Sequence, residues 1–209
     1  MSLYEYLLEN YNENEPIFVS EIAIEDMTDV NLRQQIKKLA DSGKIKKFDT
    51  GIYFIPKKSV FCSGSQLSPY KVIEQKYIRS PKERYGYISG MMLANQMGLT
   101  TQVRMVYEVV TNKATKDYRE TMLAKTRVVI RKPRAEVTED NYKTLQFLDL
   151  MKDIDSYSEI EGEQLQKHLL RYMQAINLKF SMLEPYLSYY PDRIYKKMYE
   201  TGLLYGISS

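Results

Sequence analysis

The residue types that most often bind metals or perform catalysis are almost absent from this chain, which has one cysteine, Cys62, and one histidine, His168, among 209 residues. A lone cysteine excludes an internal disulfide. A conventional four-ligand zinc site would need carboxylates for at least two of its ligands. Neither residue has a sequence neighbour that could activate it as a nucleophile or base. We therefore expect no metal, no cofactor and no catalytic residue, and predict that the protein is not an enzyme.

Long apolar runs are also lacking. The longest uncharged stretch, residues 85–103, is interrupted by glycine, asparagine, glutamine and threonine, and would not cross a bilayer core unaided. The first fifteen residues carry four glutamates and no base, which does not fit the positive segment of a secretory signal. We therefore expect a cytoplasmic protein with no membrane partner.

Charge is segregated along the chain, although the net charge is only +3. Residues 1–30 carry eight acids and no base, and residues 31–60 carry eight bases and two acids. Residues 61–135 carry fourteen bases against five acids, and residues 136–209 carry eight against twelve. Segregation of this kind can build a basic face that holds phosphate backbones. The alternative is that the charges of the middle third scatter over different faces after folding.

The first sixty residues have the pattern of three helices followed by a hairpin. Helices are predicted over residues 2–11 and 19–24, and a third extends from an N-cap at Thr28 or Asp29 to a stop at Gly43. Two apolar runs, residues 45–48 and 52–55, flank Asp-Thr-Gly and predict two paired strands. This order is typical of a winged helix-turn-helix, so we predict a winged helix DNA-binding domain over residues 1–60.

The third helix and the hairpin, or wing, would contact DNA. Leu32, Ile36 and Leu39 form the apolar stripe of the helix, which leaves amides and cations on its other faces. Asparagine and glutamine can pair with adenine edges, and arginine and lysine with guanine or phosphate, while wing lysines hold the flanking backbone. The predicted DNA-binding residues are Asn31, Arg33, Gln34, Lys37, Lys38, Lys46, Lys47, Lys57 and Lys58.

Two alternatives to DNA binding stay open. Winged helices also bind proteins, and a lysine-rich hairpin is often only a solvated edge that its charge protects from pairing. The first alternative is therefore a protein-interaction module whose winged helix does not bind DNA. The second is an enzyme that acts on nucleic acid, because carboxylate or tyrosine chemistry leaves only weak traces in a sequence.

After residue 60 the pattern changes. A linker-like stretch, residues 62–69, leads into a helix that begins at Ser68 and Pro69 and runs to about Arg79. A further helix follows Ser89 and ends before Gly98, and segments 103–112 and 125–132 have the Val, Ile and Tyr content of strands. From Thr138 the pattern is helical. We predict an α+β protein, with a mixed α/β domain over 61–135 and a helical region over 136–209 that packs with it.

Basic residues of the middle third form a second group of candidates. They could extend the DNA footprint, meet an acidic partner, or simply be solvated. This possible extended basic surface consists of Arg79, Lys82, Arg84, Arg127, Arg131, Lys132 and Arg134.

Five short segments resemble the AbiEi-like antitoxins of type IV toxin–antitoxin systems, the antitoxin half of a bacterial abortive-infection pair. The segments are "GIYFIP" (51–56), "YISG" (87–90), "LANQMGLTTQV" (93–103), "VVTN" (109–112) and "LEPYLSYYPDRIYKKMYETGLLYG" (183–206). Together with the winged helix pattern that ends in "GIYFIP", they cover nearly the whole chain in the order of the family.

The resemblance implies a transcriptional repressor of its own operon that also acts as an antitoxin in phage defence. Its implied functional partner is a nucleotidyltransferase-like toxin encoded downstream, neutralised without an obligatory tight complex. The DNA-reading helix of the family maps here to residues 29–42 and its wing to 46–58. We expect binding to double-stranded DNA at an inverted repeat, which requires two copies, as a homodimer or assembled cooperatively on DNA.

Overall fold

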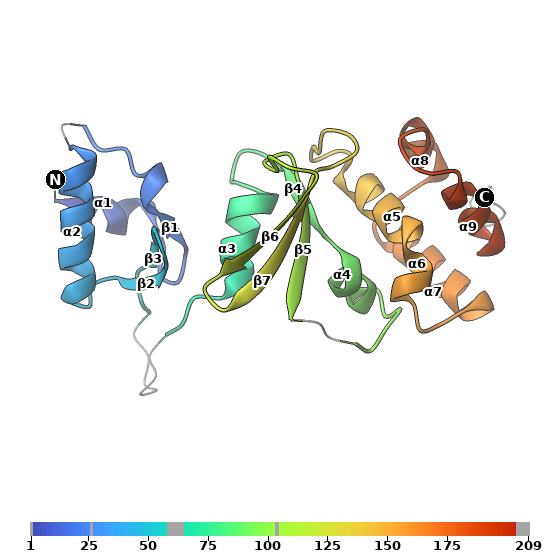
Figure 1. Ribbon diagram of the computed structural model, residues 1–209, viewed down its shortest axis with the longest axis horizontal. Coiled ribbons are helices and arrows are strands. Elements are labelled where there is room, and N and C mark those ends of the chain that lie inside the picture. Colours follow the sequence, from blue (N-terminus) through green and yellow to red (C-terminus); the bar gives the residue numbers. More distant parts are fainter. Residues whose placement is uncertain (1, 26, 58–64, 103–104, 204–209) are drawn as a thin grey trace. The chain divides into compact units, whose positions relative to one another are not determined.

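The protein is described by a computed structural model that covers residues 2–25, 27–57, 65–102 and 105–203 (Figure 1). It forms two compact units, Met1–Gln75 and Lys76–Ser209. Each unit combines helices with a small sheet of its own. The predicted α+β class is therefore confirmed.

The first unit packs helices against a three-stranded antiparallel sheet. Its elements are α1 Leu3–Asn10, β1 Ile17–Phe18, a 3₁₀ turn Val19–Glu21, α2 Asp29–Asp41, β2 Lys46–Asp49 and β3 Ile52–Phe54. The sheet order is β1-β3-β2, so β3 is central and β2 is an edge. The core is formed by Leu3, Leu7, Ile17, Leu32, Ile36, Ile45 and Ile55.

Local sequence signals explain where α2 begins and ends. The hydroxyl of Thr28 accepts a hydrogen bond from the backbone N–H of Asn31 at 3.3 Å, which caps the first turn. Gly43, at φ 75°, turns the chain out of the helix in the left-handed conformation that glycine adopts without strain. The predicted third helix and hairpin are thus confirmed, whereas the predicted second helix is only the 3₁₀ turn.

The chain passes from the first unit to the second through α3, Pro69–Ile73, and a π-helical turn, Glu74–Ile78. These two segments occupy the stretch for which a helix to about Arg79 is predicted. Pro69 at the first helical position agrees with the expected start.

The second unit places its helices against one four-stranded sheet. The sheet consists of β4 Gly86–Ser89, β5 Val106–Thr111, β6 Tyr118–Leu123 and β7 Thr126–Arg131, in the order β4-β5-β7-β6. β5 and β7 are parallel, and the other two pairs are antiparallel. β4 and β6 were not predicted from the sequence.

The helices of the second unit share one core with the sheet (Figure 1). They are α4 Gly90–Gln96, α5 Tyr142–Lys152, α6 Ile154–Tyr157, α7 Gly162–Ala175, α8 Phe180–Leu187 and α9 Arg193–Glu200. α5 contacts β4, α8 and α9, and is buried on most of its surface. Within the described part of the chain, no helix has both the length and the apolar character needed to cross a membrane.

Candidate nucleic-acid interface

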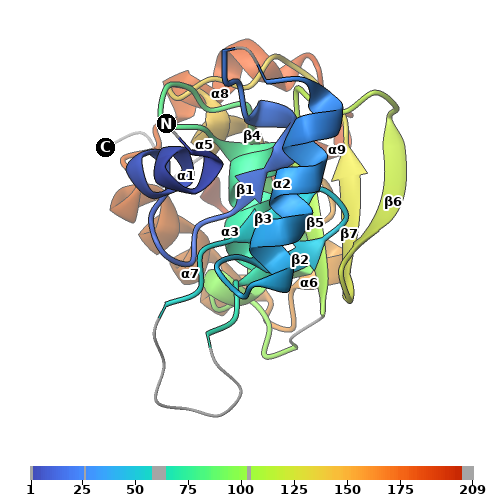
Figure 2. The same ribbon diagram turned by 90° about the vertical axis from the view of Figure 1, so that its left-hand side faces the viewer.

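The outer face of α2 carries the predicted amide and basic side chains. Only Leu32 and Ile36 of this helix are buried, so the helix contributes one narrow stripe to the core. The side chains on its other faces are open to solvent, and Figure 2 shows α2 in front of the first unit with the β2–β3 hairpin beside its C-terminal end. The exposed candidates on α2 are Asn31, Arg33, Gln34, Lys37 and Lys38.

The hairpin adds exposed lysines next to the end of α2. Lys46 and Lys47 lie on the edge strand β2, where successive side chains point to opposite faces. The two lysines therefore flank the hairpin on either side. Lys57 is exposed beyond β3, and its backbone N–H donates to the Ser65 hydroxyl at 2.9 Å. Lys58 lies outside the described residues.

These cations of the first unit have no acidic partner in the part of the chain that the structure describes. No ion pair within 4 Å joins a described carboxylate to Arg33, Lys37, Lys38, Lys46, Lys47 or Lys57. Binding a phosphate would therefore not require them to give up an internal ion pair. Their charge is available for the electrostatic attraction that dominates affinity for nucleic acid.

Two features of this face were not anticipated from the sequence. Val30 is 67% exposed at the first turn of α2, and its helical angle places it between Lys37 and Gln34. Such an exposed valine can contact a thymine methyl group. The amide of Gln35 donates to the Asn31 side chain at 3.2 Å, which orients the Asn31 amide. The exposed Val30 could have been found by the same 100° projection that placed the polar residues.

The basic residues of the second unit are arranged differently, because several are bound internally. Arg84 pairs with Glu139 at 2.9 Å and lies over the ring of Tyr142. Arg134 donates to the backbone carbonyl of Tyr189 at 2.8 Å. Ion pairs also join Arg127 to Glu120 and Arg131 to Glu108.

The other three candidates of the second unit are exposed. Arg79 faces Arg84 across an isolated backbone bridge. Lys82 and Lys132 have no ion pair with a described carboxylate. Three of the seven candidates, Arg84, Arg127 and Arg131, are thus paired with carboxylates, whereas none of the six described cationic candidates of the first unit pairs with a described carboxylate.

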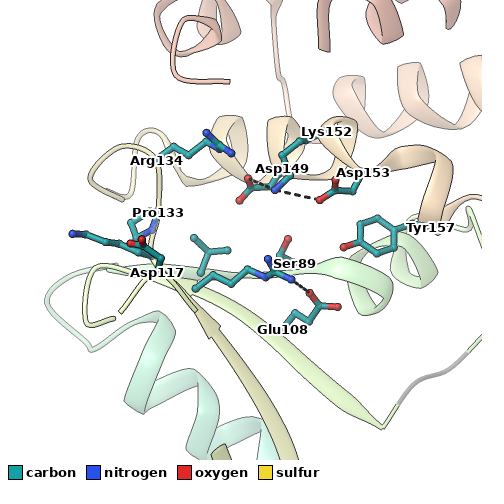
Figure 3. Close-up of a pocket in the computed structure, with 12 residues that line it drawn as sticks. Ser89, Glu108, Asp117, Pro133, Arg134, Asp149, Lys152, Asp153 and Tyr157 are labelled. Atoms are coloured by element: carbon teal, nitrogen blue, oxygen red, sulfur yellow. Dashed lines mark ion pairs between the residues drawn. The ribbon is translucent and has the colours of Figure 1, made fainter. Parts of the chain in front are cut away.

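A polar cavity of about 370 Å³ lies between the sheet and α5–α6 (Figure 3). Lys152 reaches Asp149 at 3.8 Å and Asp153 at 3.2 Å on one side of the cavity. Burial raises the pKa of Tyr157 to about 12, so its hydroxyl stays protonated at neutral pH. The lining consists of Ser89, Glu108, Val110, Asp117, Arg131, Lys132, Pro133, Arg134, Asp149, Lys152, Asp153 and Tyr157. Its four cations match its four carboxylates, so the lining does not select a ligand by net charge.

Asp149 is the buried acid of this cavity, at 8% exposure. Its carboxylate accepts a 2.6 Å hydrogen bond from the Tyr87 hydroxyl. Burial raises the pKa of Asp149, while the Tyr87 hydrogen bond and Lys152 partly oppose that shift. The arrangement joins β4 to α5 and offers no evident nucleophile.

The described residues show no evident site for metal binding or for catalysis by histidine. Across the described residues, no group of three histidine, cysteine or carboxylate side chains is placed to hold a metal ion. The Nδ1 atom of His168 lies 2.9 Å from the carbonyl of Gln164, one turn earlier in α7, so this ring is tied to its own helix. Cys62 lies outside the described residues.

Neither a scan against protein-family models nor a search of curated proteins gives a match to this chain.

Proposed function

We propose that the first unit is a winged helix that binds double-stranded DNA, and that the protein is a transcriptional repressor of its own operon. The observation that carries this proposal is the group of cations on α2 and the hairpin without described acidic partners, together with the exposed Asn31 and Gln34. The order α1, β1, 3₁₀ turn, α2, β2, β3 supports it, because a helix followed by a hairpin is the arrangement a winged helix uses. The 3₁₀ turn would take the place of the middle helix.

The dimensions of α2 suit a major groove. An α-helix with its side chains is about 10–12 Å across, which fits a major groove about 12 Å wide, and the thirteen residues of α2 can extend about 20 Å along it. Recognition helices contact base edges mainly through their N-terminal residues. Asn31 and Gln34 lie in that half of α2 and would read bases, whereas Lys37 and Lys38 lie nearer its end and would contact phosphates. Lys46 and Lys47 would hold the backbone beside the groove.

Replacing Asn31 and Gln34 by alanine should reduce sequence preference more than affinity. Each amide that pairs with an adenine in two hydrogen bonds contributes about 1–3 kcal/mol of discrimination. Competition gel shifts with the upstream DNA against a scrambled duplex would measure the ratio. The matched control is Gln174→Ala on the exposed surface of α7, which should leave the preference unchanged. An unaltered preference in the double variant would mean that other residues read the bases.

We further propose, from the resemblance to AbiEi-like antitoxins, that the second unit neutralises a nucleotidyltransferase-like toxin. Co-expression with the product of the adjacent reading frame should restore growth, and deletion of the second unit should abolish the rescue. If the full chain fails to rescue growth, the proposed antitoxin activity is refuted and only the proposed repressor function remains. Co-purification with a protein partner, combined with no gel shift on upstream DNA, would instead favour the interaction module.

A further inference from the structure

β6 is an open edge of the second unit's sheet. It is the last strand in the order β4-β5-β7-β6, and Figure 2 shows no element of its own unit beyond it. Proteins usually protect such edges with charged side chains, proline, a β-bulge, a very short strand or a covering segment. β6 has six residues, no proline and a regular register with β7, and its two charged residues, Arg119 and Glu120, have opposite signs. The backbone groups on its outer side are not used by β7 and can pair with another strand, although the carbonyl of Met122 accepts a hydrogen bond from the Thr121 hydroxyl at 3.5 Å.

The hydrogen-bond pattern shows which backbone groups face that open edge. Leu123 and Thr126 pair across a two-residue loop, and the N–H of Lys132 donates to the carbonyl of Asp117 at 3.2 Å. Backbone groups alternate between the two sides of an antiparallel strand. The odd-numbered residues of β6 therefore bond to β7. The N–H and C=O groups of Tyr118, Glu120 and Met122 point to the open edge.

The same three residues share one face of the strand. Two of them are large exposed apolar side chains, Tyr118 at 49% and Met122 at 57% exposure. If two copies of β6 pair antiparallel with Glu120 opposite Glu120, each Tyr118 lies opposite Met122 of the other copy. The dimer then contains two favourable aromatic–methionine pairs, each formed by Tyr118 of one copy and Met122 of the other.

We propose that β6 pairs with β6 of a second copy about a two-fold axis at Glu120, which joins the two four-stranded sheets into one. This interface is isologous, as expected for a closed dimer. The two Glu120 carboxylates near the axis are not bare charges, because Arg127 of the same chain donates its Nε–H to Glu120 at 2.9 Å. The four charges therefore balance across the axis. The dimer does not depend on DNA binding, although it would supply the two copies that an inverted repeat requires.

The mass of the full chain in solution, measured without DNA by light scattering and sedimentation, tests the proposal. We expect a concentration-dependent dimer, and a monomer for Met122→Pro. Proline is tolerated on an edge strand when its N–H is not needed, and the N–H of Met122 faces away from β7. Circular dichroism and thermal unfolding would verify that this variant keeps its fold. A monomeric native chain, or a dimer that survives Met122→Pro in a folded variant, would overturn the proposal.

A matched pair of charge substitutions separates the interface from a general effect of replacing a methionine. Met122→Lys removes both Tyr118–Met122 pairs by symmetry and should weaken dimerisation about tenfold or more. Met105→Lys changes an equally apolar side chain that is 83% exposed elsewhere, and should leave dimerisation unchanged. Equal effects of both substitutions would contradict an interface at β6.

Cross-linking tests the register. In a Cys62→Ser background, Glu120→Cys should be joined between copies by a short bis-maleimide, because this position lies at the axis. Lys125→Cys lies five residues from it, so two such thiols would be roughly 30 Å apart and should not be joined. Equal cross-linking at both positions, or binding of a different protein along β6 by a chain that is itself monomeric, would rule out this pairing.

Discussion

Replacing Lys37, Lys38, Lys46 and Lys47 together by alanine should weaken binding to the upstream DNA more than about tenfold and flatten its salt dependence. Each lysine that neutralises a phosphate releases bound counterions, so removing one such lysine reduces the slope of log K against log salt by about one. The slope should therefore fall by about three to four if all four lysines bind phosphates. Gel shifts or fluorescence titrations over a series of salt concentrations would measure both quantities.

A second quadruple variant distinguishes local binding from a general decrease in net charge. Lys116, Lys125, Lys167 and Lys179 are exposed in the second unit and have no ion pair with a described carboxylate. Their replacement by alanine removes the same total charge, but should change the slope little. Native-like binding by the first variant would refute the assignment of α2 and the hairpin. Equal weakening in both variants would show that DNA affinity depends on the net charge of the protein and not on where the lysines lie.

Tyr87→Phe should lower the free energy of unfolding by about 1.5–3 kcal/mol at a pH where Asp149 is ionised, the usual range for a hydrogen bond to a charged group. The Tyr87 hydroxyl donates to Asp149, and both side chains are buried. Without that donor, the ion-pair partner that the described residues offer this carboxylate is the Lys152 ammonium at 3.8 Å. Urea denaturation of both chains would measure the difference.

The cost of Tyr87→Phe should depend on pH in a defined direction. The folded-state pKa of Asp149 is raised above its ordinary value, so the stability contributed by its protonated form is lost as pH rises through that pKa. The Tyr87 hydrogen bond lowers the pKa of Asp149, and its removal raises that pKa further. The destabilisation should therefore be larger above the raised pKa of Asp149, where the carboxylate is ionised, than below it, where the carboxyl group is protonated.

Two variants serve as controls for this buried pair. Tyr172→Phe removes a hydroxyl that donates to the neutral Gln146 side chain at 3.3 Å, so its cost should be smaller and independent of pH in this range. Adding Asp149→Asn to Tyr87→Phe should remove the pH dependence, because the titrating group is gone. A pH dependence that persists in the double variant would assign it to another residue.

Local signals predicted α2 and the hairpin well. The Thr28 cap, the Gly43 stop and the turn at Gly51, with φ 71°, all act within a few residues of the sequence. β1 escaped prediction because two residues show no periodicity, and it exists only through its pairing with β3. β6 escaped because its sequence, YRETML, is largely polar and relies on β7 for its partner.

In the candidate site too, features set by nearby residues could be predicted, whereas contacts between distant residues could not. Exposure of the polar residues on α2 follows from helical geometry alone, so the sequence was sufficient to predict it. The internal pairing of Arg84 with Glu139 joins residues 55 positions apart, and no local pattern shows such a contact. Tyr87 and Asp149 are 62 positions apart, and their contact likewise arises only when β4 packs on α5.

The strand order of the second unit also has a kinetic consequence. The β6–β7 hairpin closes through a two-residue loop, whereas the parallel pairing of β5 with β7 must close a longer one, which is entropically more costly and slower. The hairpin would therefore form early and dock on β5 through β7 alone. In this order of folding, β6 is an edge strand as soon as the sheet forms. A nascent chain would therefore expose β6 before α5 and the later helices have been synthesised.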